Sequence, residues 1–486
     1  MPVNSTHPEY QYFEPIWRTI DDFVLGEKQV KDKNTLYLPK QNEWTNDQYL
    51  EYLEMAPFTN FTVRTINALL GAMFIKDPLI SLPEPITYLL DNADGRGNSI
   101  LQVVRRMALE AIKKGRSGVY VDFPRVQADS GEREPSIADT EGLNSTFVMY
   151  DAIDIINWKE DDNGLTQVVL RERVESQYDT FQSRYVTQYR VLNKIDGVYS
   201  VQLWRNGDFA ATGDLLDEYT PTDANKQPFS YIPFFFNGAV NNDATCDNSP
   251  VYEIVSKNKT HYQLEAQVMR SIITVGSPML VVSVGDLPAQ QFLELNGIEN
   301  GEPLVYGVNR GLIVGNTGSA SLLQAKANDM AQTKADRVLT EAIMLGARLV
   351  TKGGSSRTTA EQIRIETSAE NAVINSIAKN IEQTVKHALG TVMAFETGQE
   401  SNDGVQFQMN TEFYAQSPDP QVLAFAKHML DTGLMAPADM LDLLKNSGLL
   451  DSNRTLEDVQ READEYMQSR PEAQIDTNPN SALQMA

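Results

Sequence analysis

The apolar residues between positions 250 and 395 recur with the 3.6-residue period of an α-helix. Three helices are predicted there, at about 251–275, 321–349 and 359–395. An apolar stripe marks the first (Val251, Ile254, Val255, Tyr262, Val268, Met269, Ile272 and Ile273) and the second (Leu323, Ala327, Met330, Ala331, Val338, Ala342 and Leu345). A helix with one apolar stripe is not stable alone. The pattern therefore predicts helices that bury these stripes against neighbours.

Segments with other patterns separate these helices. The run MLVVSVGD at 279–286 has the composition of a strand, and the glycine-rich sequence up to Gly318 predicts turns. After the second helix, TKGGSSRTTAE predicts a loop, and Thr358 with Glu361 forms a capping-box pattern at the start of the third helix. That third helix would be roughly 55 Å long. This order of elements suits the wall of an assembly better than the core of an enzyme.

The rest of the chain divides into a helical part, a β part and a helical end, which makes the predicted fold class α+β. Residues 1–127 are predicted to be mainly helical, with helices at 47–56, 63–74 and 100–114. Residues 146–238 have the pattern of strands, with turns at Asp161–Gly164 and Asp196–Gly197. Near the end, a strand at GVQFQMN precedes helices at 420–432, 437–447 and about 455–468, and the polar tail is predicted to be disordered.

Acidic residues outnumber basic ones by 66 to 41, which gives a formal net charge of −25. Segment 400–486 is strongly acidic, whereas 251–399 is nearly neutral. A protein that grips DNA normally presents a basic face. Two explanations of the acidic excess stay open. It serves solubility, or it forms a surface that nucleic acid passes without binding.

The sequence also indicates the compartment in which the chain is made. The sequence has no run of about 18 apolar residues, so no membrane span is predicted. A basic region followed by an apolar one is missing at the N-terminus, so no secretory signal is expected. The single cysteine, Cys246, excludes an internal disulfide and fits a reducing compartment. We expect the chain to be made in the cytoplasm.

Familiar patterns of catalytic and metal-binding residues are missing from the sequence. It contains no GxxxxGK[ST] phosphate loop, no GxGxxG after a strand and no GxSxG elbow. The four histidines, His7, His261, His387 and His428, are scattered and have no cysteine partners. The acidic cluster KEDDNG at 159–164 is typical of a hairpin turn rather than a metal site. We therefore expect no catalytic activity and no bound cofactor, nucleotide or metal.

Three segments stand out, although each has a plain structural explanation. LEAIKKGRSGVYVDFP at 109–124 has the pattern of a helix with cations at its C-terminus, followed by a strand. MYDAIDIINWKE at 149–160 alternates loosely up to Trp158, as a buried strand does. TKGGSSRTTAE at 351–361 is explained by a flexible connection between helices.

In this order and at this spacing, the segments resemble the bacteriophage portal proteins, in particular a portal-like family long catalogued as a domain of unknown function. The resemblance covers roughly residues 60–395. It implies a portal-type fold with a mixed α/β wing, a two-helix stem, a small β-containing clip, a long tunnel helix and a helical crown. It is carried by GRSGVYVDFP, YDAIDIINW, MAQTKADRVLTEAIMLGARLV, the loop, and TTAEQIRIETSAENAVINSIAKNIEQTVKHAL.

The resemblance implies a place for every part of the chain. A portal is a ring, usually of about twelve copies, at one capsid vertex, through which double-stranded DNA is packaged and ejected. The implied partners are further copies of the chain, DNA without sequence specificity, the major capsid protein, the terminase large subunit and a head–tail adaptor. The implied location is the virion, with no membrane. The implied parts are a wing at 1–249, stem helices at 250–275 and 321–349, a clip at 276–320, a tunnel loop at 350–358, a long wing and tunnel helix at 359–401, a crown at 402–468 and a flexible tail at 469–486.

The tunnel loop is the implied DNA contact. Its residues are Lys352, Gly353, Gly354, Ser355, Ser356 and Arg357. The two glycines give the backbone freedom to move beside DNA, and the two cations would touch phosphates without reading sequence. A near-neutral channel would let DNA slide, whereas a strongly basic one would hold it through counterion release.

Two other classes of protein remain open. One is a different virion structural protein, such as a tail or baseplate component. The other is an enzyme with an unrecognised site, which would gather several carboxylates with shifted pKa values in one pocket.

Overall fold

The structure is a computed structural model that describes residues 2–123, 144–179, 182–205, 213–276, 279–298, 311–324, 329–348, 360–401, 403–411, 420–446, 450 and 457–462. The chain divides into two compact units, Met1–Thr411 and Glu412–Ala486. Helices and strands are both abundant, which confirms the predicted α+β class.

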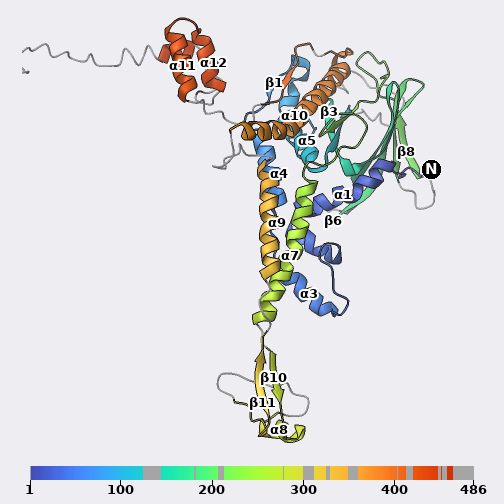
Figure 1. Ribbon diagram of the computed structural model, residues 1–486. Helices are drawn as coiled ribbons and strands as arrows, with labels where there is room; N and C mark the ends of the chain where they lie inside the picture. The colour runs from blue at the N-terminus through green and yellow to red at the C-terminus, as the bar shows by residue number, and fades with distance from the viewer. Residues whose placement is uncertain are drawn as a thin grey trace, which may run out of the picture. The chain divides into compact units, whose positions relative to one another are not determined.

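The N-terminal part of the first unit is mainly helical (Figure 1). Capping boxes start two of its helices, with Thr45 and Gln48 at one and Ser99 and Gln102 at the other. The helices predicted at 47–56, 63–74 and 100–114 are confirmed with small shifts of their ends. The helical elements are α1 (Pro8–Leu25), α2 (Glu27–Asp32), η1 (Asn34–Leu36), α3 (Asn46–Met55), α4 (Phe61–Met73), η2 (Glu84–Leu90) and α5 (Ile100–Lys114).

The sequence pattern did not predict α1, α2, η1 or η2, and α1 is the longest of these elements. Its interior contains Pro15, a residue that usually ends or kinks a helix. The helix nevertheless forms because its inner face, with Trp17, Ile20 and Phe23, is fully buried. Packing therefore outweighs the local preference of one residue.

Two antiparallel sheets follow. The smaller has the strand order β3-β2-β9, and the larger is a meander in the order β4-β5-β6-β7-β8. The predicted turns at Asp161–Gly164 and Asp196–Gly197 are confirmed, because each joins two paired strands. The strands are β2 (Arg116–Asp122), β3 (Thr146–Asp151), β4 (Ile155–Asp161), β5 (Gly164–Asp179), β6 (Gln182–Ile195), β7 (Val198–Arg205), β8 (Asp214–Tyr219) and β9 (Phe234–Gly238), with the 3-10 turn η3 (Ala152–Asp154) before β4.

A long excursion leaves this body after residue 251. Its elements are α7 (Tyr252–Gly276), β10 (Met279–Ser283), α8 (Ala289–Leu295), β11 (Ser319–Leu323) and α9 (Asp329–Arg348). The first predicted helix is confirmed by α7. The predicted start of the second helix is wrong, because residues 321–323 belong to β11, which pairs with β10 from Leu323 opposite Met279. A short apolar run fits either period, and the long-range pairing decides between them.

The chain then returns through α10 (Ala360–Thr397) and β12 (Gln406–Gln408). Helix α10 confirms the long third helix and packs on α5, β2 and β9. Strand β12 pairs with β1 (Leu79–Ser81). The C-terminal unit therefore begins after Thr411, and the predicted boundary at 402 is wrong because this strand pairing ties residues 406–408 to the first unit.

The second unit contains α11 (Pro420–Asp431) and α12 (Pro437–Asn446), which pack on each other. Both confirm predicted helices, and Gly433, with φ of 73°, lies at the predicted stop after α11. Residues 457–462 are helical, in agreement with the third predicted helix over the part that is described.

Candidate functional site

Helices α7 and α9 form an antiparallel pair (Figure 1). Near one end of the pair, Lys257 Nζ lies 2.7 Å from Glu341 Oε2. Toward the other end, Gln324 Nε2, just before α9, donates to the carbonyl of Val275 at 3.0 Å. In both contacts the two residue numbers add up to almost the same total. This means that one antiparallel register holds along the whole α7–α9 pair.

The upper part of this pair is anchored to α4. Ile254 of α7, Ala342 of α9 and Phe61 of α4 form a buried apolar cluster. Asn258 is fully buried, accepts hydrogen bonds from the backbone N–H and the hydroxyl of Thr62, and donates to the Thr59 carbonyl. At this end the pair is held like any other core element.

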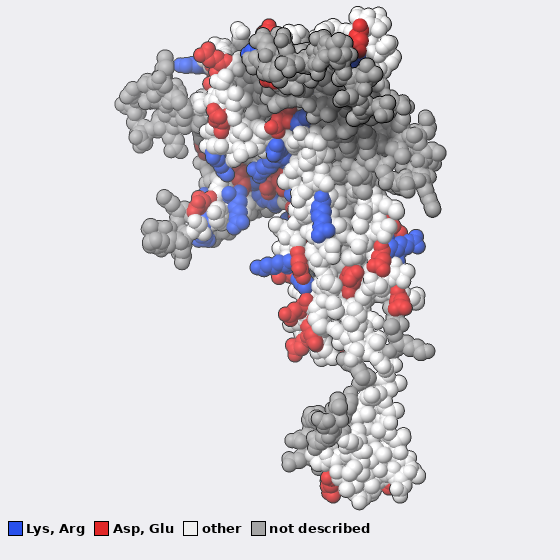
Figure 2. All heavy atoms as spheres, turned by 90° about the vertical axis from the view of Figure 1, so that its left-hand side faces the viewer, with Lys and Arg blue, Asp and Glu red and all other residues white. Residues whose placement is uncertain are grey.

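The lower part of the excursion is different, because its apolar side chains are exposed. The described residues 279–298 and 311–324 contain only two charged residues, Asp286 and Glu294, and Figure 2 shows this end of the molecule almost free of charge. Depletion of charge together with exposed apolar area is typical of a surface that a partner covers. The exposed apolar residues include Ile272, Ile273, Met279, Val281, Leu322, Leu323 and Met330.

Higher on the helix pair, the charges of both signs alternate (Figure 2). Arg337 lies 3.0 Å from Glu341, which also pairs with Lys257. Hydrogen bonds from these two cations lower the pKa of Glu341. The described surface of the α7–α9 pair is therefore mixed rather than basic, as the nearly neutral composition of residues 251–399 predicts.

One histidine is buried in the helix pair. His261 of α7 packs edge-on against Phe61, and its Nε2 lies 3.5 Å from Glu265 Oε1. Burial lowers the pKa of His261, and the charges of Glu265 and Asp336 oppose this only in part. The imidazole is therefore neutral at pH 7.

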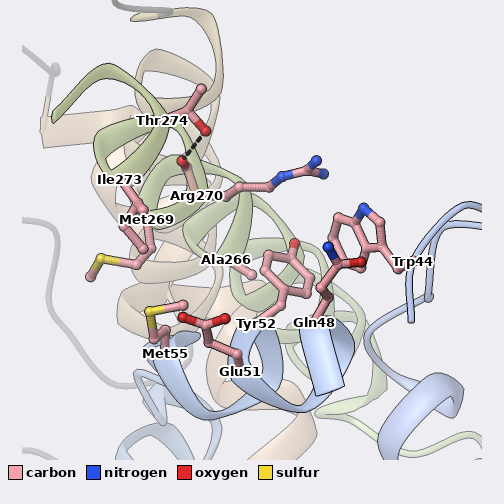
Figure 3. A pocket seen from close by; sticks show the side chains of 10 residues that line it. All are labelled: Trp44, Gln48, Glu51, Tyr52, Met55, Ala266, Met269, Arg270, Ile273 and Thr274. Carbon is pink, nitrogen blue, oxygen red and sulfur yellow. Dashed lines mark hydrogen bonds between the residues drawn. The ribbon is translucent and has the colours of Figure 1, made fainter. Parts of the chain in front are cut away.

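A cavity of about 230 Å³ opens between α3 and the last turns of α7 (Figure 3). Its apolar wall includes Met55, Met269 and Ile273. At its edge the Arg270 guanidinium lies 4.3 Å from the centre of the Trp44 ring and donates to Gln41 Oε1 at 3.0 Å. Arg270 therefore links α7 to the Trp44 ring and to Gln41 at this edge of the cavity.

The cations of the 109–124 segment lie in the interior rather than at a solvated helix end. Lys114 is fully buried, with Nζ 2.9 Å from Asp21 Oδ2, 3.4 Å from Glu110 Oε2 and paired with Asp151. Burial alone would lower the pKa of Lys114, but the three carboxylates outweigh it and raise that pKa. The sequence pattern therefore marks a structural ion cluster that joins α1, α5 and β3.

Arg116 connects this segment to the tryptophan segment. Its guanidinium lies between the Trp158 and Phe236 rings, 4.2 and 3.9 Å from their centres, and donates to the Ala244 carbonyl at 2.8 Å. The same group contacts Cys246, whose pKa burial raises to about 12. Both segments that stood out in the wing are thus explained by core packing.

The predicted DNA contacts Lys352, Gly353, Gly354, Ser355, Ser356 and Arg357 lie outside the described residues. Within the described part, no three His, Cys, Asp or Glu side chains are grouped as a metal site would require. Among the same residues, no helix has both the length and the hydropathy of a membrane span.

Residues 250–396 match a family described as “Domain of unknown function (DUF4055)”. The match confirms that this part of the chain resembles a family catalogued under that description. It includes the whole α7–α9 excursion and nearly all of α10. No curated protein matches the chain.

Solved structures with some similarity come from a gene transfer agent particle. Three of them are each 11% identical to this chain: “Virion of native gene transfer agent (GTA) particle” (TM-score 0.39; 85% of this chain and 98% of that one covered), “Neck of empty GTA particle computed with C6 symmetry” (0.37; 84% and 95%) and “Neck of native GTA particle computed with C12 symmetry” (0.35; 83% and 94%).

Proposed function

We propose that this chain is the portal protein of a phage-type capsid. About twelve copies form a ring at one vertex, and double-stranded DNA is packaged and ejected through its channel. In this proposal α7 and α9 are the stem, residues 276–320 with β11 are the clip, and residues 350–358 are the tunnel loop. The wing comprises residues 1–251 with α10 and β12, and the crown comprises the second unit.

One observation carries the proposal. The α7–α9 pair and the β10–β11 hairpin expose apolar residues that the described part of the first unit does not cover. A two-stranded hairpin is marginal on its own, so this part needs neighbours for its stability. A ring of copies supplies them around a common axis. The portal resemblance of the sequence supports this reading, as does the family match over residues 250–396.

The remaining roles follow from that ring. The clip would dock the terminase motor during packaging and the head–tail adaptor afterwards, and the wing would face the major capsid protein. The chain would supply no catalysis, since ATP hydrolysis belongs to the motor. DNA would pass a channel of mixed charge, which holds it weakly because few counterions are released.

Electron microscopy and mass photometry of the purified protein test the proposal. We expect rings with a central hole and a mass of about twelve chains. Particles of eleven or thirteen copies would still be rings of this kind. Protein that stays monomeric under capsid-assembly conditions, or that forms tubes or fibres, would contradict the proposal and favour a tail component.

A variant separates ring formation from folding. Val281→Asp with Leu322→Asp places charges on the exposed hairpin, and we expect rings to be lost while the circular dichroism spectrum is kept. Leu216→Asp, at an exposed apolar position of β8, is the matched control and should leave rings intact. Equal loss of rings in both variants would show that the hairpin is not a contact surface.

A further inference from the structure

We propose that the cavity between α3 and α7 receives the outward face of α9 from a neighbouring copy, with Met330 inside the cavity and a charge pair on either side of it. The inference rests on the proposed ring and adds which surfaces of two adjacent copies meet.

The two surfaces lie on opposite sides of α7. In Figure 1, α9 is on one side of α7 and α3 is on the other, and both helices pack on α7. They therefore cannot meet within one chain at this level. A closed ring is built from head-to-tail contacts, in which one side of each copy meets the opposite side of the next. The exposed face of α9 and the cavity at α3 are such a pair of sides.

The two surfaces also lie at the same level along the helices. The ion pair between Glu341 of α9 and Lys257 of α7 fixes the antiparallel register. Met330 lies 11 residues before Glu341, and Val268 lies 11 residues after Lys257. Met330 is therefore level with Val268. The cavity is lined by α7 residues from Ala266 to Thr274. Rotation about a ring axis along the stem keeps each residue at its level, so Met330 of one copy reaches the cavity of the next.

At the centre of the proposed contact, an apolar side chain of α9 meets the apolar lining of the cavity. Met330 is 80% exposed, and the cavity presents Met55, Met269 and Ile273. A methionine side chain is flexible and adapts to an irregular apolar cavity. Thr333, one turn further along α9, is small and exposed, so it lets the two helices approach.

Charges of opposite sign flank this centre in matching order. Figure 3 places Glu51 toward the Ala266 end of the cavity and Arg270 toward the Thr274 end. On α9, Arg337 lies four residues before Glu341, which places it level with His261 of α7. Asp329 begins α9 and lies level with Met269 of α7. In the proposed contact Arg337, which pairs with Glu341 of its own helix, approaches Glu51. Asp329 approaches Arg270 in the same contact. Both α9 residues are exposed.

Cross-linking in assembled rings tests the contact. Met55→Cys with Met330→Cys, treated with a cross-linker spanning under about 10 Å, should give a ladder of covalent oligomers on a denaturing gel. Met55→Cys with Met344→Cys is the matched control. Its α9 cysteine lies 14 residues further along, about 21 Å away, and should give no ladder. The half-buried native Cys246, with its raised pKa, reacts little and stays in both variants.

The outcomes separate this inference from the proposed function. If rings form and only Met55→Cys with Met330→Cys gives a ladder, the contact and the portal proposal are both supported. Rings without that ladder, or with the same ladder from the Met344 pair, overturn the contact and leave the portal proposal standing. Monomers in the unmodified protein overturn both.

Charge reversal gives a second and independent measurement. Glu51→Arg should weaken the contact between neighbours roughly two- to fivefold, seen as a higher protein concentration for half-assembly in mass photometry. Adding Arg337→Glu in the same chain should restore assembly. Glu54→Arg, on the same helix but outside the cavity, should have no effect. Failure of the double variant to recover, or an equal effect of Glu54→Arg, would overturn the pairing.

Discussion

The proposed wing and the lower part of the proposed stem satisfy their side chains in opposite ways. In the wing, Lys114 meets three carboxylates and Arg116 is enclosed by two aromatic rings, all from the same chain. In the lower stem and the hairpin, Ile272, Leu322 and Met330 remain exposed. The first region is packed within a single chain, whereas in the proposed ring the second is covered by other copies.

This difference predicts two separate classes of variant. Changes in the wing should act on the unfolding of a single chain and only through it on assembly. Changes in the lower stem should leave the single chain folded and act on assembly. Four experiments test or sharpen that division, and their expected effects on stability decrease in the order given.

Lys114→Met should have the largest effect. The substitution keeps the length of the side chain but leaves the buried Glu110, Asp21 and Asp151 with too little positive charge. Removing one partner of a buried ion pair typically costs about 3–5 kcal/mol. Urea unfolding followed by circular dichroism measures the loss, and Lys194→Met at the surface should change stability by under about 0.5 kcal/mol. A loss of similar size in both variants would contradict a structural role for the cluster.

Asn258→Ala should destabilise the chain by a smaller amount. It leaves the backbone N–H of Thr62 and the carbonyl of Thr59 buried without their partner. An unsatisfied buried group costs about 1–3 kcal/mol. The same unfolding measurement applies, with Thr260→Ala on the neighbouring, half-exposed face of α7 as control. If Asn258→Ala unfolds like the control, the upper stem is not anchored through this residue.

His261 should make stability depend on pH. Burial lowers its folded-state pKa below the unfolded value of about 6.5. The folded state therefore takes up the proton less readily, so this contribution to stability is complete above pH 6.5 and declines as the pH falls below it. Unfolding midpoints at pH 7.5 and 5.5 should differ less in His261→Gln than in the parent protein. The buried carboxyls with raised pKa act in the opposite direction, but they are common to both proteins and cancel in the comparison.

Lys352→Ala with Arg357→Ala should have almost no effect on stability, under about 0.5 kcal/mol, and none on ring assembly. It should instead lower the amount of DNA packaged or retained per capsid, because the loop loses its phosphate contacts. Ser355→Ala with Ser356→Ala keeps the charge of the loop and should lower the DNA content less, because the cations carry the stronger phosphate contacts. Normal DNA content in the double-alanine variant of the two cations would show that they are ordinary surface residues.

Local sequence signals were enough to predict most helices of this fold. Ser99 with Gln102 forms the capping box that starts α5, and Gly433 lies just after α11. The hairpin turn at Asp196–Gly197 was equally clear, since Asp and Gly accept the positive φ that it needs. These features depend on neighbours in sequence, so the sequence shows them directly.

Features that depend on distant segments were missed. The start of the second stem helix was placed in β11 because Leu323 fits a helical stripe until Met279 is known to pair with it. Lys114 was correctly placed at a helix C-terminus, but its burial was not predicted, since nothing nearby in sequence shows that Asp21 and Asp151 surround it. The cavity at Trp44 and Arg270 gave no sequence signal, because its walls are more than 200 residues apart. The loop Lys352–Arg357 stays a prediction.

The pairing of β1 with β12 has a consequence for synthesis on the ribosome. Residues 360–411 complete the packing of the proposed wing, because α10 covers the small sheet and β12 pairs with β1. These residues are made only after the whole α7–α9 excursion. Between β9 at Gly238 and β12 at Gln408, translation at about 5–20 residues per second takes roughly ten to thirty seconds. During that interval the surface of the small sheet that α10 covers is open to solvent. The nascent chain therefore presents two uncovered surfaces at once, one that α10 later covers and one that another copy covers in the proposed ring.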